Sequence, residues 1–254
     1  MQSDFIQSDP VKPVRLSPIV VPKTSDVLAS ELRRQILSRQ LPPGASLPTE
    51  RELVTQTGLS RGSVRDALRI LESESLVVTR PGRYGGSVAN QPGDESLKRS
   101  ISSFVHGRGI TLLSLLQTRE AVEPSLAALA AKNRTDEELQ GLIEVTEKVE
   151  NAFLTPPEFL RENVDWHMAI AAASHNELLR AFLHSISNMV YKASAIENFA
   201  TEEVRNHVVY AHRRILEAIA AQDEELAGRR MALHLAAVTA ACMDFPNAPL
   251  VLDF

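Results

Sequence analysis

The stretch LSRGSVRDALRILE, residues 59–72, decides how the first part of this 254-residue chain folds. Ser60 precedes the apolar pattern and can cap a helix, because its hydroxyl accepts a bond from a backbone N–H that has no partner at the helix start. The apolar residues recur at helical spacing and form one stripe, made of Val64, Leu68 and Leu71. Arginines share a neighbouring face, at positions 61, 65 and 69. The stretch therefore predicts a helix with one buried face and one basic face.

A shorter helix is predicted immediately before this one. Thr49 and Glu52 form a T-x-x-E capping box, in which the hydroxyl and the carboxylate each bind a backbone N–H at the start of a helix. The helix is expected over 51–57 and ends at Gly58, so two helices flank a tight turn. A further helix begins near Thr24 and is stopped by the Pro-Pro-Gly sequence at 42–44.

Short strands are expected on the other side of the basic helix. Residues 76–78 and 87–88 are short strand candidates that flank a turn rich in Gly and Arg, RPGRYGG at 80–86. Such a hairpin would form a small β wing beside the two helices. The sequence after it is helical in pattern, with helices expected near 97–107, 111–132, 135–152, 157–173, 174–198, 201–221 and 223–243.

Capping boxes at Thr135/Glu138 and Ser174/Glu177 set two of these helix starts, and Pro124 should kink the helix that contains it. Short connections favour an antiparallel bundle. The fold class is therefore mainly α: a winged helix-turn-helix followed by an all-α bundle. The expected divisions are a flexible arm at 1–22, the winged domain at 23–89, a linker at 90–96, the helical ligand-binding and dimerisation domain at 97–245, and a tail at 246–254.

The charge of the chain is divided between these parts. Residues 11–90 carry 12 Lys/Arg and 7 Asp/Glu, whereas residues 91–254 carry 15 Lys/Arg and 23 Asp/Glu. Clustered cations suit a module that contacts phosphates, although chance clustering of surface charge is the alternative. The single cysteine, Cys242, excludes an internal disulfide framework. No signal segment and no apolar run long enough for a membrane span occur, so a cytoplasmic location without membrane contact is expected.

Two stretches, LPPGASLPTEREL at 41–53 and LSRGSVRDALRILE at 59–72, resemble the signature of the GntR family of bacterial regulators. The resemblance implies that the winged helix-turn-helix reads DNA, with Arg61 and Arg65 at the start of the recognition helix in the major groove. A guanidinium matches guanine O6 and N7 or a phosphate, and these two arginines are an i, i+4 pair. The DNA-binding set predicted in this way is Arg51, Ser60, Arg61, Ser63, Arg65, Gly82 and Arg83.

Each member of this set has an expected role or an alternative to it. Arg51 should grip the DNA backbone, and the wing residues Gly82 and Arg83 should contact phosphates or the minor groove. The alternative is a solvated basic face, in which Arg65 pairs with Glu72 or Asp66. Two departures from the family pattern are a longer wing and Ser75, which stands where the family ends its recognition helix with glycine.

The C-terminal part resembles the helical ligand-binding domain of the FadR-like subfamily, of FCD type. The resemblance rests on R-x-x-x-E at 119–123, NVDWH at 163–167, and two later histidines. It implies a divalent metal site, with zinc or nickel as the expected ion, formed by Asn163, His167, His212 and His234. Asn163 and His167 are spaced i, i+4 on one helix. His212 and His234 fall roughly level, about 15 Å and 18 Å from a turn near Gln222 at 1.5 Å per residue. The alternative is that each histidine is a satisfied core residue.

Arg119 shares a helical stripe with Leu112, Leu116, Glu123 and Leu126, so it is expected to point inward, where it needs an anion. That anion is either Glu123 or the carboxylate of a bound effector. The second possibility predicts a small organic acid or sugar acid as the effector.

These observations together predict a regulator without enzymatic activity or catalytic residues. It would be a homodimeric repressor that binds a pseudo-palindromic, double-stranded operator and is released by its effector. One alternative is a metal-dependent enzyme with a DNA-targeting module, although no H-E-x-x-H stretch occurs. The other is a non-specific architectural DNA binder.

Overall fold

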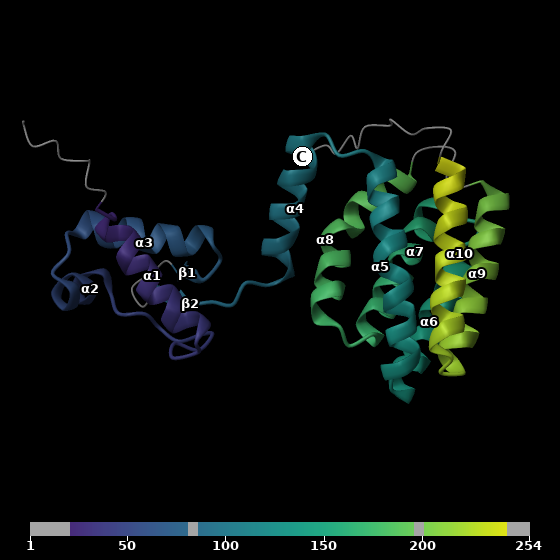
Figure 1. Cartoon of the computed structure of the whole chain (residues 1–254), viewed down its shortest axis with the longest axis horizontal. Helices are drawn as coiled ribbons and strands as arrows, with labels where there is room; N and C mark the ends of the chain where they lie inside the picture. Colours follow the sequence, from purple (N-terminus) through teal and green to yellow (C-terminus); the bar gives the residue numbers. More distant parts are fainter. Residues whose placement is uncertain (1–20, 81–85, 196–200, 243–254) are drawn as a thin grey trace, which may run out of the picture. The chain divides into compact units, whose positions relative to one another are not determined.

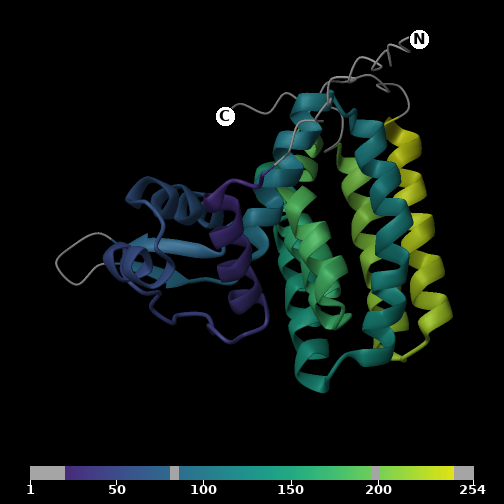
Figure 2. The same ribbon diagram turned by 60° about the vertical axis from the view of Figure 1, so that its left-hand side comes forward.

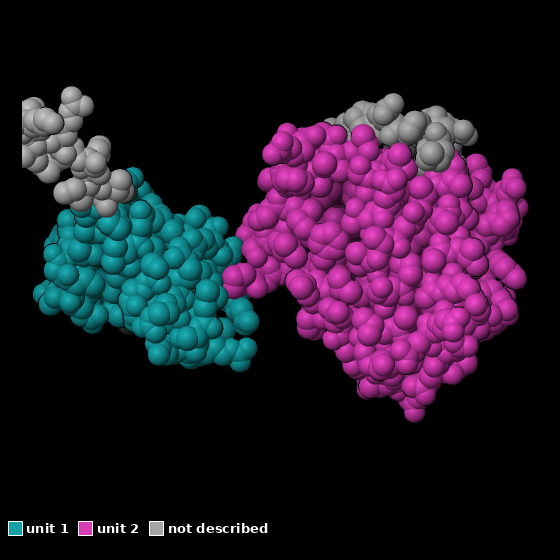
Figure 3. Space-filling view, viewed as in Figure 1, with its two compact units in different colours: residues 1–91 teal, residues 92–254 magenta. Residues whose placement is uncertain are grey.

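The computed structural model describes residues 21–80, 86–195 and 201–242. The chain divides into two compact units, residues 1–91 and 92–254 (Figure 3). The wing residues Gly82 and Arg83, most of the expected N-terminal arm and the expected C-terminal tail lie outside the described residues. None of the helices in the described residues is both long and apolar enough to cross a membrane.

The first unit has three helices and one hairpin among its described residues (Figure 1). The elements are α1 (Thr24–Leu37), α2 (Glu50–Thr57), α3 (Arg61–Ser73), β1 (Val77–Arg80) and β2 (Gly86–Ala89). The strands pair antiparallel with Val77 opposite Ala89 and Arg80 opposite Gly86. A bridge from Ser46 to Val88 extends the sheet on the other side of β2. This is the expected winged helix-turn-helix.

Local sequence signals explain the helix-turn-helix. The Thr49 side chain accepts a hydrogen bond from the Glu52 backbone, and the Glu52 side chain accepts one from the Thr49 backbone, so the predicted capping box is present. Gly58 has φ +71 and closes α2 in the left-handed conformation, which glycine adopts without steric cost. The predicted stripe of α3 is buried, with Val64 and Leu71 fully inaccessible to solvent.

The second unit is an all-helical bundle in which the long helices run side by side (Figures 1 and 2). Its helices are α4 (Asp94–Arg108), α5 (Leu112–Asn133), α6 (Asp136–Asn151), α7 (Pro156–Ala173), α8 (Glu177–Ser194), α9 (Glu202–Ala220) and α10 (Glu224–Cys242). The largest fully buried side chain of its core is Trp166. α5 continues through Pro124, whose carbonyl would lie 3.1 Å from a Cβ placed on Gly228 of α10. Glycine at 228 therefore allows the two helices to approach closely.

Two helix starts differ from the sequence predictions. α4 begins at Asp94, so residues 94–96 of the expected linker form its first turn. The predicted capping box at Ser174 and Glu177 is wrong. Ser174 still has helical dihedral angles at the end of α7, and the chain then turns through His175 at φ +55. Asn176 takes the capping position instead, because its Oδ1 accepts a hydrogen bond from the Leu179 backbone at 3.1 Å. The Thr135 and Glu138 box is confirmed.

Candidate functional site

The basic face of α3 is exposed, as its pattern predicts. Arg61, Arg65 and Arg69 are all accessible to solvent, on the face of the helix next to its buried stripe. Arg65 Nε lies 2.9 Å from Glu50 Oε2 on α2, with side-chain exposures of 60% and 42%. The expected alternative partners of Arg65 were Glu72 and Asp66, and neither is the one that it contacts. An ion pair this exposed contributes little to stability, so Arg65 can exchange Glu50 for another anion at small cost.

Ser60 and Ser63 organise the start of α3. Ser60 Oγ accepts a hydrogen bond from the Ser63 backbone N–H at 3.1 Å, and the two hydroxyl oxygens are 3.0 Å apart. Thr24 of α1 also donates to Ser63 Oγ at 3.1 Å. These contacts give both serines a structural role at the helix start, where backbone N–H groups also favour an anion. Arg51 is exposed on α2.

Three histidines from different helices meet in the core of the second unit. They are His167 of α7, His212 of α9 and His234 of α10, and one ring nitrogen from each lies within 4.8 Å of the others. All three are buried, with exposures of 4%, 0% and 7% respectively. The predicted alignment of His212 and His234 across the turn near Gln222 brings their ring centroids to 5.1 Å.

Several polar atoms around this cluster have no partner in the described part of the chain. They are His167 Nε2 and both ring nitrogens of His212; Asn163 Oδ1, one helical turn before His167 on α7, is likewise buried without a partner there. Unpaired buried polar atoms are costly, and their concentration at one place in a core points to a missing ligand. Three imidazoles with one amide oxygen form a donor set that fits zinc or nickel. The residues present therefore fit a divalent metal ion.

Glu123 links the cluster to Arg119. Its Oε1 accepts a hydrogen bond from Arg119 Nε, and its Oε2 lies 2.5 Å from His167 Nδ1. Both Arg119 and Glu123 are buried, so Glu123 is the anion that satisfies Arg119 in this structure. The sequence indicated the i, i+4 pair but not the contact with His167, because that contact joins α5 to α7 and leaves no periodic signal.

The electrostatics of the cluster favour neutral imidazoles. Burial lowers the pKa of His167, and burial together with the neighbouring histidines lowers the pKa of His212 well below its ordinary value. Burial lowers the pKa of His234 to about 3. Burial alone would raise the pKa of Glu123, but the Arg119 guanidinium and the contact with His167 together outweigh it and hold that pKa below its usual range. The histidines therefore keep the free lone pairs that metal binding requires.

A small cavity adjoins the cluster on the side of α8. It measures about 10 Å³ and is lined from α5 by Arg119 and Glu123, from α7 by His167, and from α8 by Leu183 and Val190. This is about the volume that one water molecule needs. Arg119 and one member of the histidine cluster, His167, both line this cavity.

Comparison with known proteins gives both units a family. Residues 24–84 match the model of the bacterial regulatory proteins of the gntR family, and residues 114–237 match the FCD domain. An Escherichia coli K12 protein named as a regulatory protein of the L-lactate dehydrogenase operon is 30% identical over 232 residues, which are 87% of each sequence. The similarity therefore spans both units.

Two further relatives extend this similarity. The transcriptional repressor NanR of Escherichia coli K12 is 28% identical over 233 residues, covering 89% of this chain and 87% of NanR. The solved structure of a Streptococcus agalactiae GntR protein superimposes with a TM-score of 0.65 at 26% identity, covering 85% of this chain and 99% of that one. All three relatives are similar over most of their length.

Proposed function

This chain belongs to the GntR family of bacterial regulatory proteins and carries an FCD domain, and from that premise we propose how its sites regulate transcription. The protein is a ligand-responsive, DNA-binding transcription regulator. In our proposal it is a homodimeric repressor without enzymatic activity. Its winged unit binds a pseudo-palindromic operator, and a small organic acid or sugar acid, bound beside a divalent metal in the helical unit, releases it.

The exposed basic face of α3 is the observation that carries the DNA-binding part of the proposal. Arg61 and Arg65 lie in the first turns of a helix that is capped and held by its buried stripe. In a helix-turn-helix, the first turns of the second helix contact base edges in the major groove. We assign Arg61 and Arg65 to base or phosphate contacts and Arg51 to the DNA backbone.

The histidine cluster supports the metal part of the proposal. His167, His212 and His234 would each donate one nitrogen, and Asn163 Oδ1 would be a fourth ligand one turn before His167 on α7. Bound there, zinc or nickel supplies a positive charge that an effector carboxylate can approach. Arg119 provides a second positive charge at the wall of the adjoining cavity.

The size of that cavity implies that effector binding changes the packing of the bundle. A carboxylic acid is larger than the water-sized space beside Arg119, so α8 must move away from α5 and α7 to admit it. Arg180 of α8 is paired with Asp94, the first residue of α4, at 3.0 Å. A movement of α8 would therefore pull on the first residue of α4 through this ion pair. α4 directly follows the winged unit in the chain, so the movement can be transmitted along the chain to the DNA-binding part.

Fluorescence anisotropy with a selected duplex tests this proposal. An operator is first enriched from a randomised duplex pool with the zinc-loaded protein, and its affinity is compared with that of a scrambled duplex at the same salt concentration. We expect preference for the enriched duplex by about 10³-fold or more, and a dyad in its sequence. Equal affinity for both duplexes would identify an architectural DNA binder and reject the proposal.

A further inference from the structure

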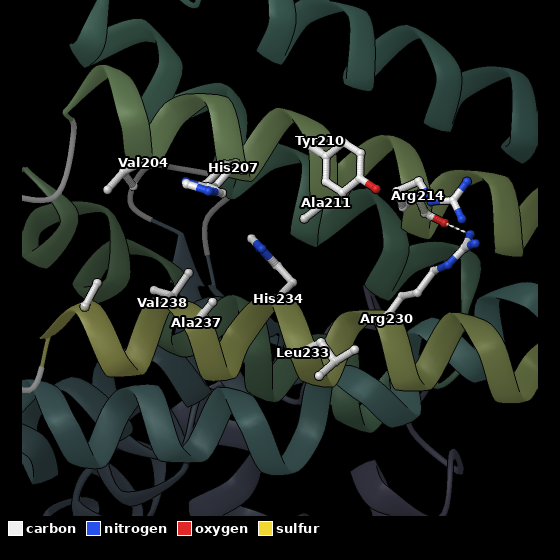
Figure 4. Close-up of a pocket in the computed structure, with 12 residues that line it drawn as sticks. Val204, His207, Tyr210, Ala211, Arg214, Arg230, Leu233, His234, Ala237 and Val238 are labelled. Carbon is white, nitrogen blue, oxygen red and sulfur yellow. Dashed lines mark hydrogen bonds between the residues drawn. The ribbon is translucent and has the colours of Figure 1, made fainter.

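A second cavity of the helical unit, separate from the one beside Arg119, lies between α9 and α10 (Figure 4). It is a groove of about 570 Å³ and is called the α9–α10 groove below. The described residues that line it all come from these two helices, and those used in the argument are Ala211, Arg214, Arg230, His234, Ala237 and Val238. Ligand sites in proteins commonly measure 300–1,000 Å³, so the groove has the size of a small-molecule site.

Small side chains create this groove. Ala211 on α9 and Ala237 on α10 stand where larger residues would bring the helix surfaces into contact. Leu233 and Tyr210 line the groove but remain 67% and 68% exposed, so their apolar surfaces are still open to solvent. The interior is therefore suited to an apolar body that would cover these side chains.

One end of the groove carries excess positive charge. Arg214 and Arg230 reach toward one another from the two helices, and Arg230 donates a hydrogen bond to the Arg214 carbonyl oxygen (Figure 4). Among the described residues, Glu217 is the carboxylate that both guanidiniums share, with Oε2 at 2.5 Å from Arg214 Nη1 and 3.5 Å from Arg230 Nη1. Two cations on one carboxylate leave one positive charge uncompensated. The Arg230 side chain is only 17% exposed, which strengthens its attraction for an anion.

We infer that the α9–α10 groove binds a small amphipathic carboxylate, with its apolar body along Ala237 and Val238 and its carboxylate at Arg214 and Arg230. This site goes beyond the proposed effector site, which uses Arg119 and the metal. His234 belongs to both places, because it lines the groove and is a member of the histidine cluster. A molecule in the groove therefore packs against the outer side of a proposed metal ligand.

Decanoate is a suitable probe, and isothermal titration calorimetry with the zinc-loaded full chain gives affinity and stoichiometry together. The expected result is one decanoate per chain. Ala237→Phe should fill the groove and weaken binding at least tenfold. Ala236→Phe is the matched control, because Ala236 is the exposed neighbour on α10 that does not line the groove, and it should bind decanoate as the unmodified chain does.

The positive end is tested with a second matched pair. Arg230→Gln should weaken decanoate binding about three- to tenfold and leave the binding of uncharged decanol unchanged, whereas Arg229→Gln, outside the groove, should change neither.

No saturable binding of decanoate, or equal affinity for decanoate in the two Phe variants, would overturn the inference. A dimer that dissociates in sedimentation only with Ala237→Phe would also overturn it, since the groove would then hold a second copy of the chain. Operator affinity measured without decanoate tests the proposed function independently of the groove.

Discussion

Glu123 Oε2 lies 2.5 Å from Nδ1 of His167, a contact that joins a buried carboxylate to the histidine cluster. A histidine that donates from Nδ1 presents the lone pair of Nε2 on the other side of the ring, and Nε2 of His167 is a buried atom without a partner in the described residues. A carboxylate behind a metal-binding imidazole orients the ring and makes it more basic. Glu123 is thus a positioning residue for the proposed metal site.

Glu123→Gln should lower zinc affinity about 10- to 100-fold, because loss of such a carboxylate commonly has this effect. A competition titration against a fluorescent zinc chelator measures it. Glu120→Gln, on the same helix, is the control. Circular dichroism establishes that the variant is folded, since Arg119 loses its anion. A folded Glu123→Gln chain with unchanged zinc affinity would exclude the positioning role.

His212→Ala should remove stoichiometric metal from the purified protein, since His212 offers one of the three ring nitrogens of the cluster. Elemental analysis before and after chelation and reloading measures the content. His175→Ala is the matched control, because His175 pairs with Glu138 at the surface and lies outside the cluster. Metal retained in full by His212→Ala, or absent from the unmodified chain after reloading, would return the histidines to a purely structural role.

The stability of the metal-free chain should depend on pH through the same histidines. Their pKa values are lowered in the folded chain, to about 3 for His234, whereas unfolded histidine titrates near 6.5. The unfolded chain therefore binds more protons below pH 6.5, so stability is greatest above that pH and falls as the pH decreases toward the folded pKa. The maximum slope is about 1.4 kcal/mol per pH unit for each histidine.

Urea denaturation in the presence of chelator, at a series of pH values between about 7.5 and 5, measures this slope. This range spans the pKa of histidine in the unfolded chain, about 6.5. His234→Asn should reduce the number of protons taken up on unfolding by about one, and the slope of the free energy of unfolding against pH should fall accordingly. An identical pH dependence in this variant would show that His234 is already charged in the folded chain.

Arg61→Ala and Arg65→Ala should each weaken operator binding by about 1 to 3 kcal/mol if they contact bases. Arg34→Ala is the control, since Arg34 is exposed on α1 and paired with Glu31. Arg51→Ala should instead weaken binding to all duplexes by a similar factor. It should also reduce the slope of log affinity against log salt concentration by about one. Unchanged operator affinity in both the Arg61 and Arg65 variants would withdraw these assignments.

Ser75→Gly should stabilise the winged unit by about 1 kcal/mol, because Ser75 has φ +59 and a left-handed non-glycine residue is strained. The free energy of unfolding measures the change. Ser73→Gly, at the last residue of α3, should have the opposite sign, since glycine destabilises a helix. A Ser75→Gly chain no more stable than the original would show that local contacts of the serine compensate for the strain.

Sequence predicted the elements in which local chemistry decides the structure. The stripe of Val64, Leu68 and Leu71 and the capping box at Thr49 needed no tertiary information. Ser174 shows the limit of this reasoning, because a left-handed turn at the neighbouring His175 made Asn176 the cap instead. Local pattern alone could not distinguish these two candidate caps.

The candidate site could be predicted only where its residues are related by spacing along the chain. The spacing about the turn near Gln222 placed His212 level with His234. The partners of Arg65 and His167, which are Glu50 and Glu123, lie on other helices. Such pairs depend on how helices pack, and a single sequence carries no periodic signal for them.

Trp166 stacks face to face on His212, with ring centroids 3.5 Å apart and an interplanar angle of 3°. It is the single tryptophan of the chain, so indole fluorescence comes from one ring in contact with one member of the histidine cluster. Any change in the charge or coordination of His212 alters the electric field at that ring. The unlabelled protein therefore contains its own optical reporter of this site, readable in a cuvette without chemical modification.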